Sequence, residues 1–215
     1  MDTNQELLHG VVKPDKMIEW GVAVQLHEGE KLSGDEYVVH PTPNAILVAA
    51  IDGIGHGPQA ASASRAAAAS IQANVQQPLE ILFETCHKAL YNTRGVVMSL
   101  AVFDRRDSSM SWLGVGNVEG RLVRADKSSS HLEDELLLRN GVIGHDLPPN
   151  IAASILPVAK GDVLIFATDG IDPAFTQGLH IGRPAHQIAN DILAGHNKAI
   201  DDALVIVAKY MGGEP

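Results

Sequence analysis

An aspartate between an apolar run and a loop of alternating glycines forms the first candidate site of the sequence. The segment Asn44–Pro58 reads NAILVAAIDGIGHGP, and Asp52 directly follows the apolar run Ala45–Ile51. Such a run predicts a strand that is buried on both faces and ends at the carboxylate. A buried carboxylate needs a cation or hydrogen-bond donors, and the sequence has no Lys or Arg between Asp52 and Arg65. A metal ion would meet this need, and the glycine loop would bring the Gly53 carbonyl close to it.

Three more aspartates stand at the ends of predicted strands. Asp169 closes an apolar run, whereas Asp35 and Asp202 stand before such runs. If neighbouring strands are antiparallel, the end of one lies beside the start of the next, so Asp35, Asp52, Asp169 and Asp202 would gather on one rim. Each of them alone is compatible with ordinary turn chemistry, but four at similar positions favour a metal site. Ligands that are all oxygen favour Mg²⁺ or Mn²⁺ over zinc.

Two further residues, His56 and Asp201, lie close to these aspartates in the sequence. His56 lies between two glycines, four residues after Asp52. It would act either as a hydrogen-bond donor or proton carrier in the site, or only as a cap or turn residue before the next helix. Asp201 precedes Asp202, and strand alternation predicts that it faces the opposite side.

The predicted elements that would position these residues are short strands and three helices. Strands are predicted at residues 18–26, 36–39, 45–51, 95–103, 111–115, 121–123, 136–139, 153–156, 163–168 and 203–209. Helices are predicted at residues 58–77, 79–92 and 184–194. This order differs from the alternation of a parallel α/β sheet and predicts an α/β (α+β) fold of two antiparallel sheets packed face to face, with helices outside.

The first predicted helix contains an alanine-rich stretch, Ala60–Ser70. Such a stretch is typical of a helix with high intrinsic propensity. The alternative is a thin helix that approaches the sheet closely and shifts against it to regulate the site.

Composition and length limit the classes of protein. The chain has 215 residues, of which 45% are hydrophobic and 20% charged, and this predicts one domain over residues 1–215. The formal net charge of −10 argues against a nucleic-acid partner. The N-terminus lacks a secretion signal, no apolar run approaches the roughly 20 residues needed to span a membrane, and the lone Cys86 fits a cytoplasmic protein. The segment Ala125–Ser130 is short enough for a loop.

Other common catalytic motifs are missing. Cys86 and Arg94 are separated by seven residues, whereas a cysteine phosphatase needs five, and Cys86 is predicted on the inner face of its helix. The segment Gly53–Pro58 does not match the dinucleotide fingerprint because its sixth residue is proline. The nucleophile motif G-x-S-x-G of serine hydrolases does not occur.

Four motifs resemble, in order and spacing, those of the PPM family of metal-dependent Ser/Thr protein phosphatases (type 2C). They are Ser33–Asp35, Ile51–Gly57, Ala167–Gly170 and Asp201–Leu204. They are most similar to the bacterial SpoIIE-type branch, and the resemblance extends from about residue 18 to residue 210. It implies an αββα four-layer sandwich, with two antiparallel β-sheets flanked by helices and two Mn²⁺ or Mg²⁺ ions at one end.

The resemblance also implies roles for individual residues. Asp52 would bridge the two ions, the Gly53 carbonyl would bind one of them, and Asp169 and Asp202 would hold the other. Asp35 would act directly or through water, so that Asp35, Asp52 and His56 are the predicted catalytic residues. Two ions at roughly 3.5 to 4 Å would activate a water for in-line attack on phosphorus.

The sequence departs from the eukaryotic members of the family at two places. It has no arginine near Asp35 to bind phosphate, and Asn117–Arg121 replaces the usual G-D-S-R. It leaves open whether Asp146 contributes to a further metal position and whether the segment Gly141–Asn150 forms a flap over the substrate.

The resemblance implies a stand-alone, cytoplasmic and monomeric phosphoserine/phosphothreonine phosphatase. The implied substrates are phosphorylated STAS-domain proteins of a stressosome, which the enzyme would reset after a stress signal, and neither nucleic acid nor a membrane is an expected partner. Two alternatives stay open from the residues alone. One is a two-metal phosphodiesterase or small-molecule phosphatase, and the other is a non-catalytic module that binds phosphoproteins.

Overall fold

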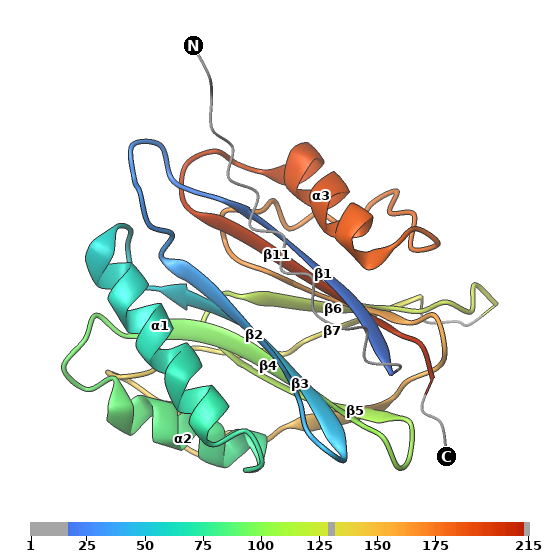
Figure 1. Ribbon diagram of the computed structural model, residues 1–215, viewed down its shortest axis with the longest axis horizontal. Helices are drawn as coiled ribbons and strands as arrows, with labels where there is room; N and C mark the ends of the chain where they lie inside the picture. The colour runs from blue at the N-terminus through green and yellow to red at the C-terminus, as the bar shows by residue number, and fades with distance from the viewer. Residues whose placement is uncertain (1–16, 129–131, 213–215) are drawn as a thin grey trace.

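The computed structural model describes residues 17–128 and 132–212. Residues 1–16, where the sequence predicted no secretion signal, and residues 129–130 of the predicted loop lie outside this description. Figure 1 shows two β-sheets with helices on their outer faces. The helices are α1 (Pro58–Ala73), α2 (Leu79–Ala89) and α3 (Ala185–His196). The strands are β1 (Ile18–Gln25), β2 (Asp35–Pro41), β3 (Ala45–Gly53), β4 (Val96–Asp104), β5 (Ser109–Val115), β6 (Glu119–Val123), β7 (Glu133–Glu135), β8 (Leu138–Arg139), β9 (Ser154–Pro157), β10 (Val163–Ala167) and β11 (Ala203–Tyr210).

The two sheets are built mainly from antiparallel pairs. One has the strand order β1-β11-β10-β6-β7, and the other has the order β2-β3-β4-β5-β8 with β9 also paired to β5. The short pair β5–β8, at the edge of its sheet, is parallel. Strand β7, a Glu-Asp-Glu segment, was not predicted because it has no apolar alternation.

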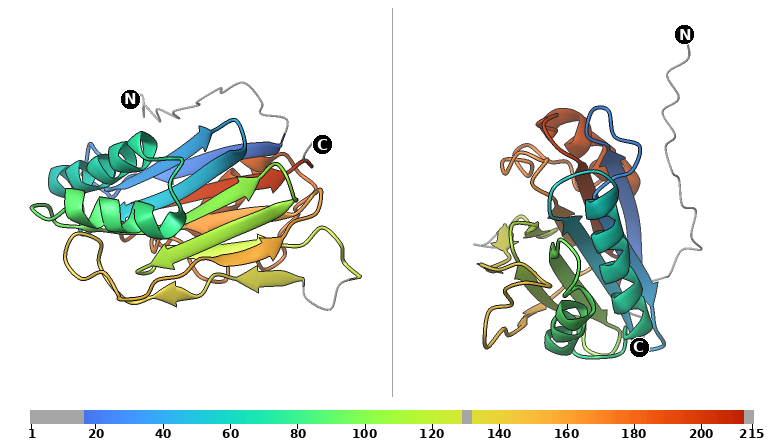
Figure 2. Two further views of the ribbon diagram at one scale, coloured as in Figure 1. Left: turned by 90° about the horizontal axis from the view of Figure 1, so that it is seen from below. Right: turned by 90° about the vertical axis from the view of Figure 1, so that its left-hand side faces the viewer.

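Three hydrophobic cores separate four layers, as Figure 2 illustrates from two sides. The central core lies between the sheets and includes Phe103 and Phe166. A second core lies between α1, α2 and the β2–β5 sheet, and a third lies between α3 and the β1–β11–β10 sheet. This arrangement confirms the predicted αββα sandwich.

Strand β3 shows why an unbroken apolar run ends at the site. Ile46 and Val48 belong to the central core, whereas Leu47 and Ala49 belong to the core beneath α1 and α2. Because side chains alternate between the two faces of a strand, both faces of β3 are covered. This explains why every residue of β3 before Asp52 is apolar.

Helix α1 packs directly on the end of β3. It begins after Gly57, whose φ of 76° favours glycine, with Pro58 in its first turn. A Cβ atom on Gly53 would lie 2.3 Å from the Ala60 carbonyl oxygen, so the two backbones touch at this point. The close approach expected of a thin helix is therefore present, and a regulatory shift of α1 stays a prediction.

Two further predictions concern single features. Cys86 is fully buried on the inner face of α2, as predicted, and burial raises the pKa of its thiol to about 11. Among the residues described, no helix combines the length and the apolar character needed to cross a membrane.

Candidate metal centre

Asp35 and Asp52 lie directly opposite each other at one end of the β2–β5 sheet. Asp35 opens β2, Asp52 stands near the end of β3, and the antiparallel register pairs the two residues. Asp35 is buried with 7% of its surface exposed, and Asp52 is partly buried. The antiparallel argument made from the sequence therefore holds for this pair.

A threonine that the sequence did not single out holds Asp35 against the other sheet. The Thr168 hydroxyl donates a hydrogen bond to Asp35 Oδ2 at 2.8 Å and accepts one from the Leu204 backbone N–H at 2.8 Å. Thr168 follows β10, and Leu204 lies in β11. One hydroxyl therefore links a carboxylate of one sheet to the backbone of the other.

Burial and mutual repulsion make Asp35 and Asp52 reluctant to ionise. Burial, together with the charges of Asp202, Asp169 and Asp201, raises the pKa of Asp35 to about 8 despite the lowering effect of the Thr168 hydrogen bond. Burial, the charge of Asp35 and the same three neighbours raise the pKa of Asp52 to about 9. Asp35 and Asp52 thus belong to a cluster of carboxylates, and no cation of the described residues contributes to the pKa of either one. A hard divalent cation would supply positive charge, so the donor set fits Mg²⁺ or Mn²⁺.

Asp169 is an exposed member of the rim. It follows β10, and its Oδ2 accepts a hydrogen bond from Asn117 Nδ2 at 3.0 Å. The next residue, Gly170, packs closely on the segment that precedes β11. A Cβ atom on Gly170 would lie 2.2 Å from the Asp202 carbonyl oxygen. Asn117 belongs to the segment that replaces G-D-S-R, so that segment still reaches the rim.

Asp202 is bound by backbone groups on both of its oxygens. Oδ1 accepts the His27 N–H at 2.8 Å, and Oδ2 accepts the Gly34 N–H at 2.7 Å. With 4% of its surface exposed, Asp202 anchors the β1–β2 loop. Its role as a metal ligand stays a prediction.

The charge of Asp201 acts on the carboxylates of the rim, whereas strand alternation predicted that this residue faces the opposite side. Strand alternation does not apply because β11 begins at Ala203, after both aspartates. Asp201 is partly buried, and its charge is among those that raise the pKa values of Asp35 and Asp52. Its Oδ1 accepts the Asp202 N–H at 2.8 Å.

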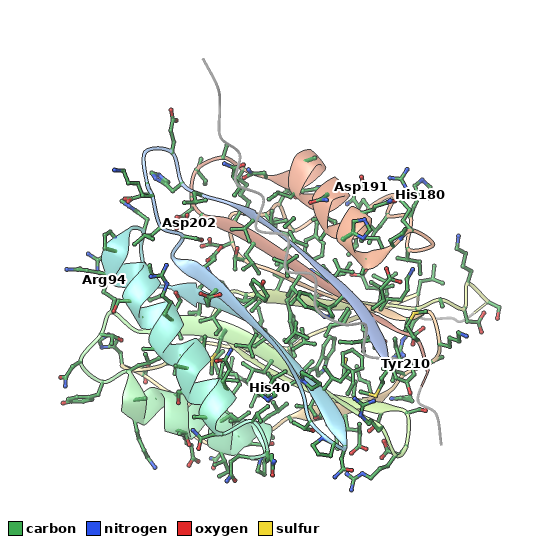
Figure 3. The ribbon with its side chains drawn as sticks, in the orientation of Figure 1. His40, Arg94, His180, Asp191, Asp202 and Tyr210 are labelled. Atoms are coloured by element: carbon green, nitrogen blue, oxygen red, sulfur yellow. The ribbon has the colours of Figure 1, made fainter. Side chains whose placement is uncertain are left out.

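Two cations that sequence reasoning missed lie beside the rim. A Cβ atom on Gly55 would lie 2.9 Å from Nη1 of Arg94, and Lys198 Nζ donates to the Asp169 carbonyl oxygen at 2.8 Å. The pairing of Gly53 with Val96 places Arg94 next to the glycine loop. The position of Arg94 could therefore have been predicted from the pairing of β3 with β4. The contact of Lys198 with Asp169 joins residues 29 positions apart, so no local sequence pattern predicts it. Figure 3 shows Arg94 and Asp202 towards the same end of the molecule, away from Tyr210.

His56 is turned towards the β1–β2 loop. Its Nδ1 lies 2.8 Å from Oε1 of Glu30, and its ring stacks on that of His27 with centroids 4.8 Å apart. The His56 side chain is 55% exposed. Its role as a proton carrier stays a prediction.

The segment Gly141–Asn150 is tied to the end of α2. Gly144 N–H donates to His87 Nδ1 at 3.0 Å, and His145 Nε2 lies 3.0 Å from the Thr93 carbonyl oxygen. These bonds place the segment next to Arg94. Asp146 is exposed there.

The four-layer sandwich and its carboxylate rim define a protein of the PP2C phosphatase fold. The family model of Stage II sporulation protein E (SpoIIE) matches residues 42–211. The chain therefore belongs to the SpoIIE family.

Individual relatives agree with this assignment. Phosphoserine phosphatase RsbX of Bacillus subtilis (strain 168) is 24% identical over 183 residues, which is 85% of this chain and 89% of that protein. A structure from work on the bacterial stressosome, described as a modular system adapted to control secondary messenger signaling, is 30% identical. It has a TM-score of 0.82 and covers 89% of this chain and 99% of its own. The crystal structure of RsbX in complex with magnesium has a TM-score of 0.81 at 23% identity and covers 92% of this chain and 98% of its own.

Proposed function

We propose that this protein is a metal-dependent phosphatase that removes phosphate from serine or threonine in a regulatory protein. The observation that carries the proposal is the facing pair Asp35 and Asp52, two carboxylates with raised pKa values at the end of the sandwich. The phosphoserine phosphatase activity named for the relative RsbX supports the same reaction. We treat residues 17–212 as one catalytic domain.

The ligands of the metal centre are proposed from the rim. Asp52, the Gly53 carbonyl and Asp169 would hold Mg²⁺ or Mn²⁺, with Asp35 acting directly or through water. The sequence favoured Asp202 as a further ligand. Because both oxygens of Asp202 accept backbone N–H groups, we propose that Asp201 takes this role and that Asp202 positions it. When bound, the ions supply Lewis-acid activation of water and offset the charge of the phosphoryl group.

Other residues of the rim would orient the reactants. The Thr168 hydroxyl fixes the rotamer of Asp35, and Asn117 does the same for Asp169. The Arg94 guanidinium lies near enough to the glycine loop to bind a phosphoryl oxygen, which answers the lack of an arginine near Asp35. His56 would give a proton to the departing seryl or threonyl oxygen once its ring leaves Glu30.

The proposed substrates are phosphorylated STAS-domain proteins of a stressosome. The similarity to RsbX and to a structure from stressosome work supports this choice. The net charge of −10 disfavours a nucleic-acid substrate. We propose a cytoplasmic monomer that releases its substrate after each turnover, with an affinity in the order of micromolar.

The test incubates kinase-phosphorylated STAS proteins with the full chain and Mn²⁺ or Mg²⁺ while intact mass follows the loss of phosphate. We expect loss of about 80 Da per phosphate with wild type, since hydrolysis replaces a phosphoryl group by a proton, and no loss with the Asp52→Asn variant. If the STAS proteins stay phosphorylated while an unrelated phosphopeptide is hydrolysed, the substrate is wrong and the phosphatase stands. Turnover of p-nitrophenyl phosphate or a cyclic dinucleotide alone would favour the small-molecule alternatives, and binding without turnover would favour the non-catalytic module.

A further inference from the structure

Beside the carboxylate rim, two loops bring together three side chains of a different chemical kind. His27 and Glu30 lie in the β1–β2 loop, and His56 lies between β3 and α1. One ligand atom from each of these side chains lies within 4.8 Å of the others. His27 and Glu30 are three positions apart, whereas Glu30 and His56 are 26 positions apart, so the fold brings His56 to the other two residues.

One nitrogen of the cluster is buried without a partner. His27 Nδ1 has no hydrogen bond to any residue in the described ranges 17–128 and 132–212. A buried polar atom without a partner costs free energy, which a ligand placed at that atom would recover. The other imidazole, His56, already points its Nδ1 at the Glu30 carboxylate, 2.8 Å away.

The surrounding backbone keeps the Glu30 carboxylate in place. A Cβ atom on Gly57 would lie 2.9 Å from Glu30 Oε1, so the glycine leaves room for the carboxylate. Gly55 and Gly57 have φ values of 83° and 76°, which favour glycine. His56 therefore stands on a short loop segment whose conformation is set on both sides.

We propose that His27, Glu30 and His56 form a binding site for a zinc-class divalent transition metal ion, separate from the carboxylate rim. Two imidazoles and one carboxylate are ligands typical of zinc with a fourth position open to water. The rim has only oxygen ligands and favours Mg²⁺ or Mn²⁺. The two sites therefore differ in the metal ion that they select.

Binding would require a modest movement of one ring. The rings of His27 and His56 are nearly parallel, with an interplanar angle of 14°. Because a metal ion lies in the plane of each imidazole that binds it, one ring must tilt to share the ion. The His56 side chain is 55% exposed and is free to make this movement, whereas His27 is partly buried.

An ion at this site would join the two loops that shape the rim. The His27 N–H holds Asp202 Oδ1, and the Gly34 N–H at the end of the same loop holds Asp202 Oδ2. Gly34 also accepts the Gly53 N–H at 3.1 Å. The bound ion would also keep the His56 ring away from the substrate, so under the proposed function zinc is an inhibitor.

The test measures metal binding directly and does not depend on activity. The full chain is saturated with Mg²⁺ to occupy the rim and is titrated with Zn²⁺ by calorimetry. We expect one tightly bound Zn²⁺ that is weakened at least about tenfold in each of the variants His27→Gln, Glu30→Gln and His56→Gln. Substitution with Co²⁺ should give visible absorption bands of a four-coordinate site, and these bands should be lost in the same variants.

Matched controls separate this site from other histidines and from the rim. Glu28→Gln makes the same chemical change two residues from Glu30, and His40→Gln removes a histidine of β2. Both should bind Zn²⁺ like wild type. If His27→Gln does not fold, Glu30→Gln still tests the site because it keeps the size of a loop side chain that is 25% exposed. The proposal is wrong if Mg²⁺-saturated wild type binds no Zn²⁺, or if all three cluster variants bind it as tightly as wild type.

Discussion

At the scale of single residues, the carboxylates of the rim differ in the partners of their oxygens. Asp35 and Asp52 face each other, and no cation of the described residues offsets the rise in their pKa values. Asp202 is as buried as Asp35, but each of its oxygens accepts a backbone N–H group. Burial alone therefore does not identify a metal ligand, and the hydrogen-bond partners of each oxygen decide between the two roles.

Asp52→Asn should separate catalysis from folding. The change removes the central negative charge of the rim and keeps the volume of the side chain, so metal-dependent turnover should fall by about 10²-fold or more. The metal-free variant should be at least as stable as wild type because the repulsion between carboxylates is relieved. Phosphatase assays and thermal melts of the metal-free proteins check the two effects. Activity close to wild type would refute the assignment of the rim as the metal centre.

Asp202→Asn should mainly lower the stability of the protein, whereas Asp201→Asn should mainly lower its affinity for metal. An asparagine at position 202 sets its NH₂ group against one of two backbone N–H donors, which should cost about 2–4 kcal/mol of stability. An asparagine at position 201 keeps an oxygen for the Asp202 N–H, so it should change stability little but weaken Mn²⁺ activation. Denaturant melts and the Mn²⁺ concentration for half-maximal activity measure these effects. A stable Asp202→Asn variant with weakened metal binding would return the ligand role to Asp202.

At the scale of elements, most of the sandwich could be predicted from the sequence. A strand that is covered on both faces appears in the sequence as a continuous apolar run. The continuous run of β3 was recognised for this reason, and its pairing with β2 followed from the antiparallel rule. The alternation rule does not apply to Asp201 because this residue lies two positions before β11 begins at Ala203. The charged strand β7 and the cation Lys198 were missed because tertiary contacts determine their positions and no local sequence pattern marks them.

Gly53→Ala tests the contact between α1 and the end of β3. The added methyl group would lie 2.3 Å from the Ala60 carbonyl oxygen, so the helix or the strand end must move. We expect a loss of about 1–3 kcal/mol in stability and a large loss of activity, because the displaced backbone includes the proposed carbonyl ligand. Gly182→Ala is a suitable control because nothing lies within 4 Å of its Cβ position. Unchanged melting and activity in Gly53→Ala would show that α1 does not determine the geometry of the rim.

At the scale of the whole molecule, the site lies where the two sheets meet at one end. Thr168 and Asp202 belong to the segments flanking β10 and β11, yet they bind Asp35 and Gly34 at the start of β2. The rim is therefore assembled only when both sheets are formed and packed. Metal binding and folding of the sandwich should be coupled for this reason.

The coupling predicts how the stability of the metal-free protein depends on pH. The pKa values of Asp35 and Asp52 are about 8 and about 9 in the folded protein, against an ordinary value of 3.8, so between about pH 4 and pH 9 the folded state holds more protons than the unfolded chain. Stability is then highest at the acidic end of this window and falls as pH rises.

Thermal melts of metal-free wild type and Asp52→Asn, recorded from pH 5.5 to pH 8.5, isolate this effect because the variant removes one of the two titrations. We expect the melting temperature of wild type to fall relative to the variant as pH rises. Saturating Mg²⁺ or Mn²⁺ should raise the melting temperature of wild type most at pH 8.5, where proton competition for the carboxylates is weakest. A constant difference between the metal-free proteins, or a stabilisation by metal that is largest at pH 5.5, would contradict the coupling of these carboxylates to the fold.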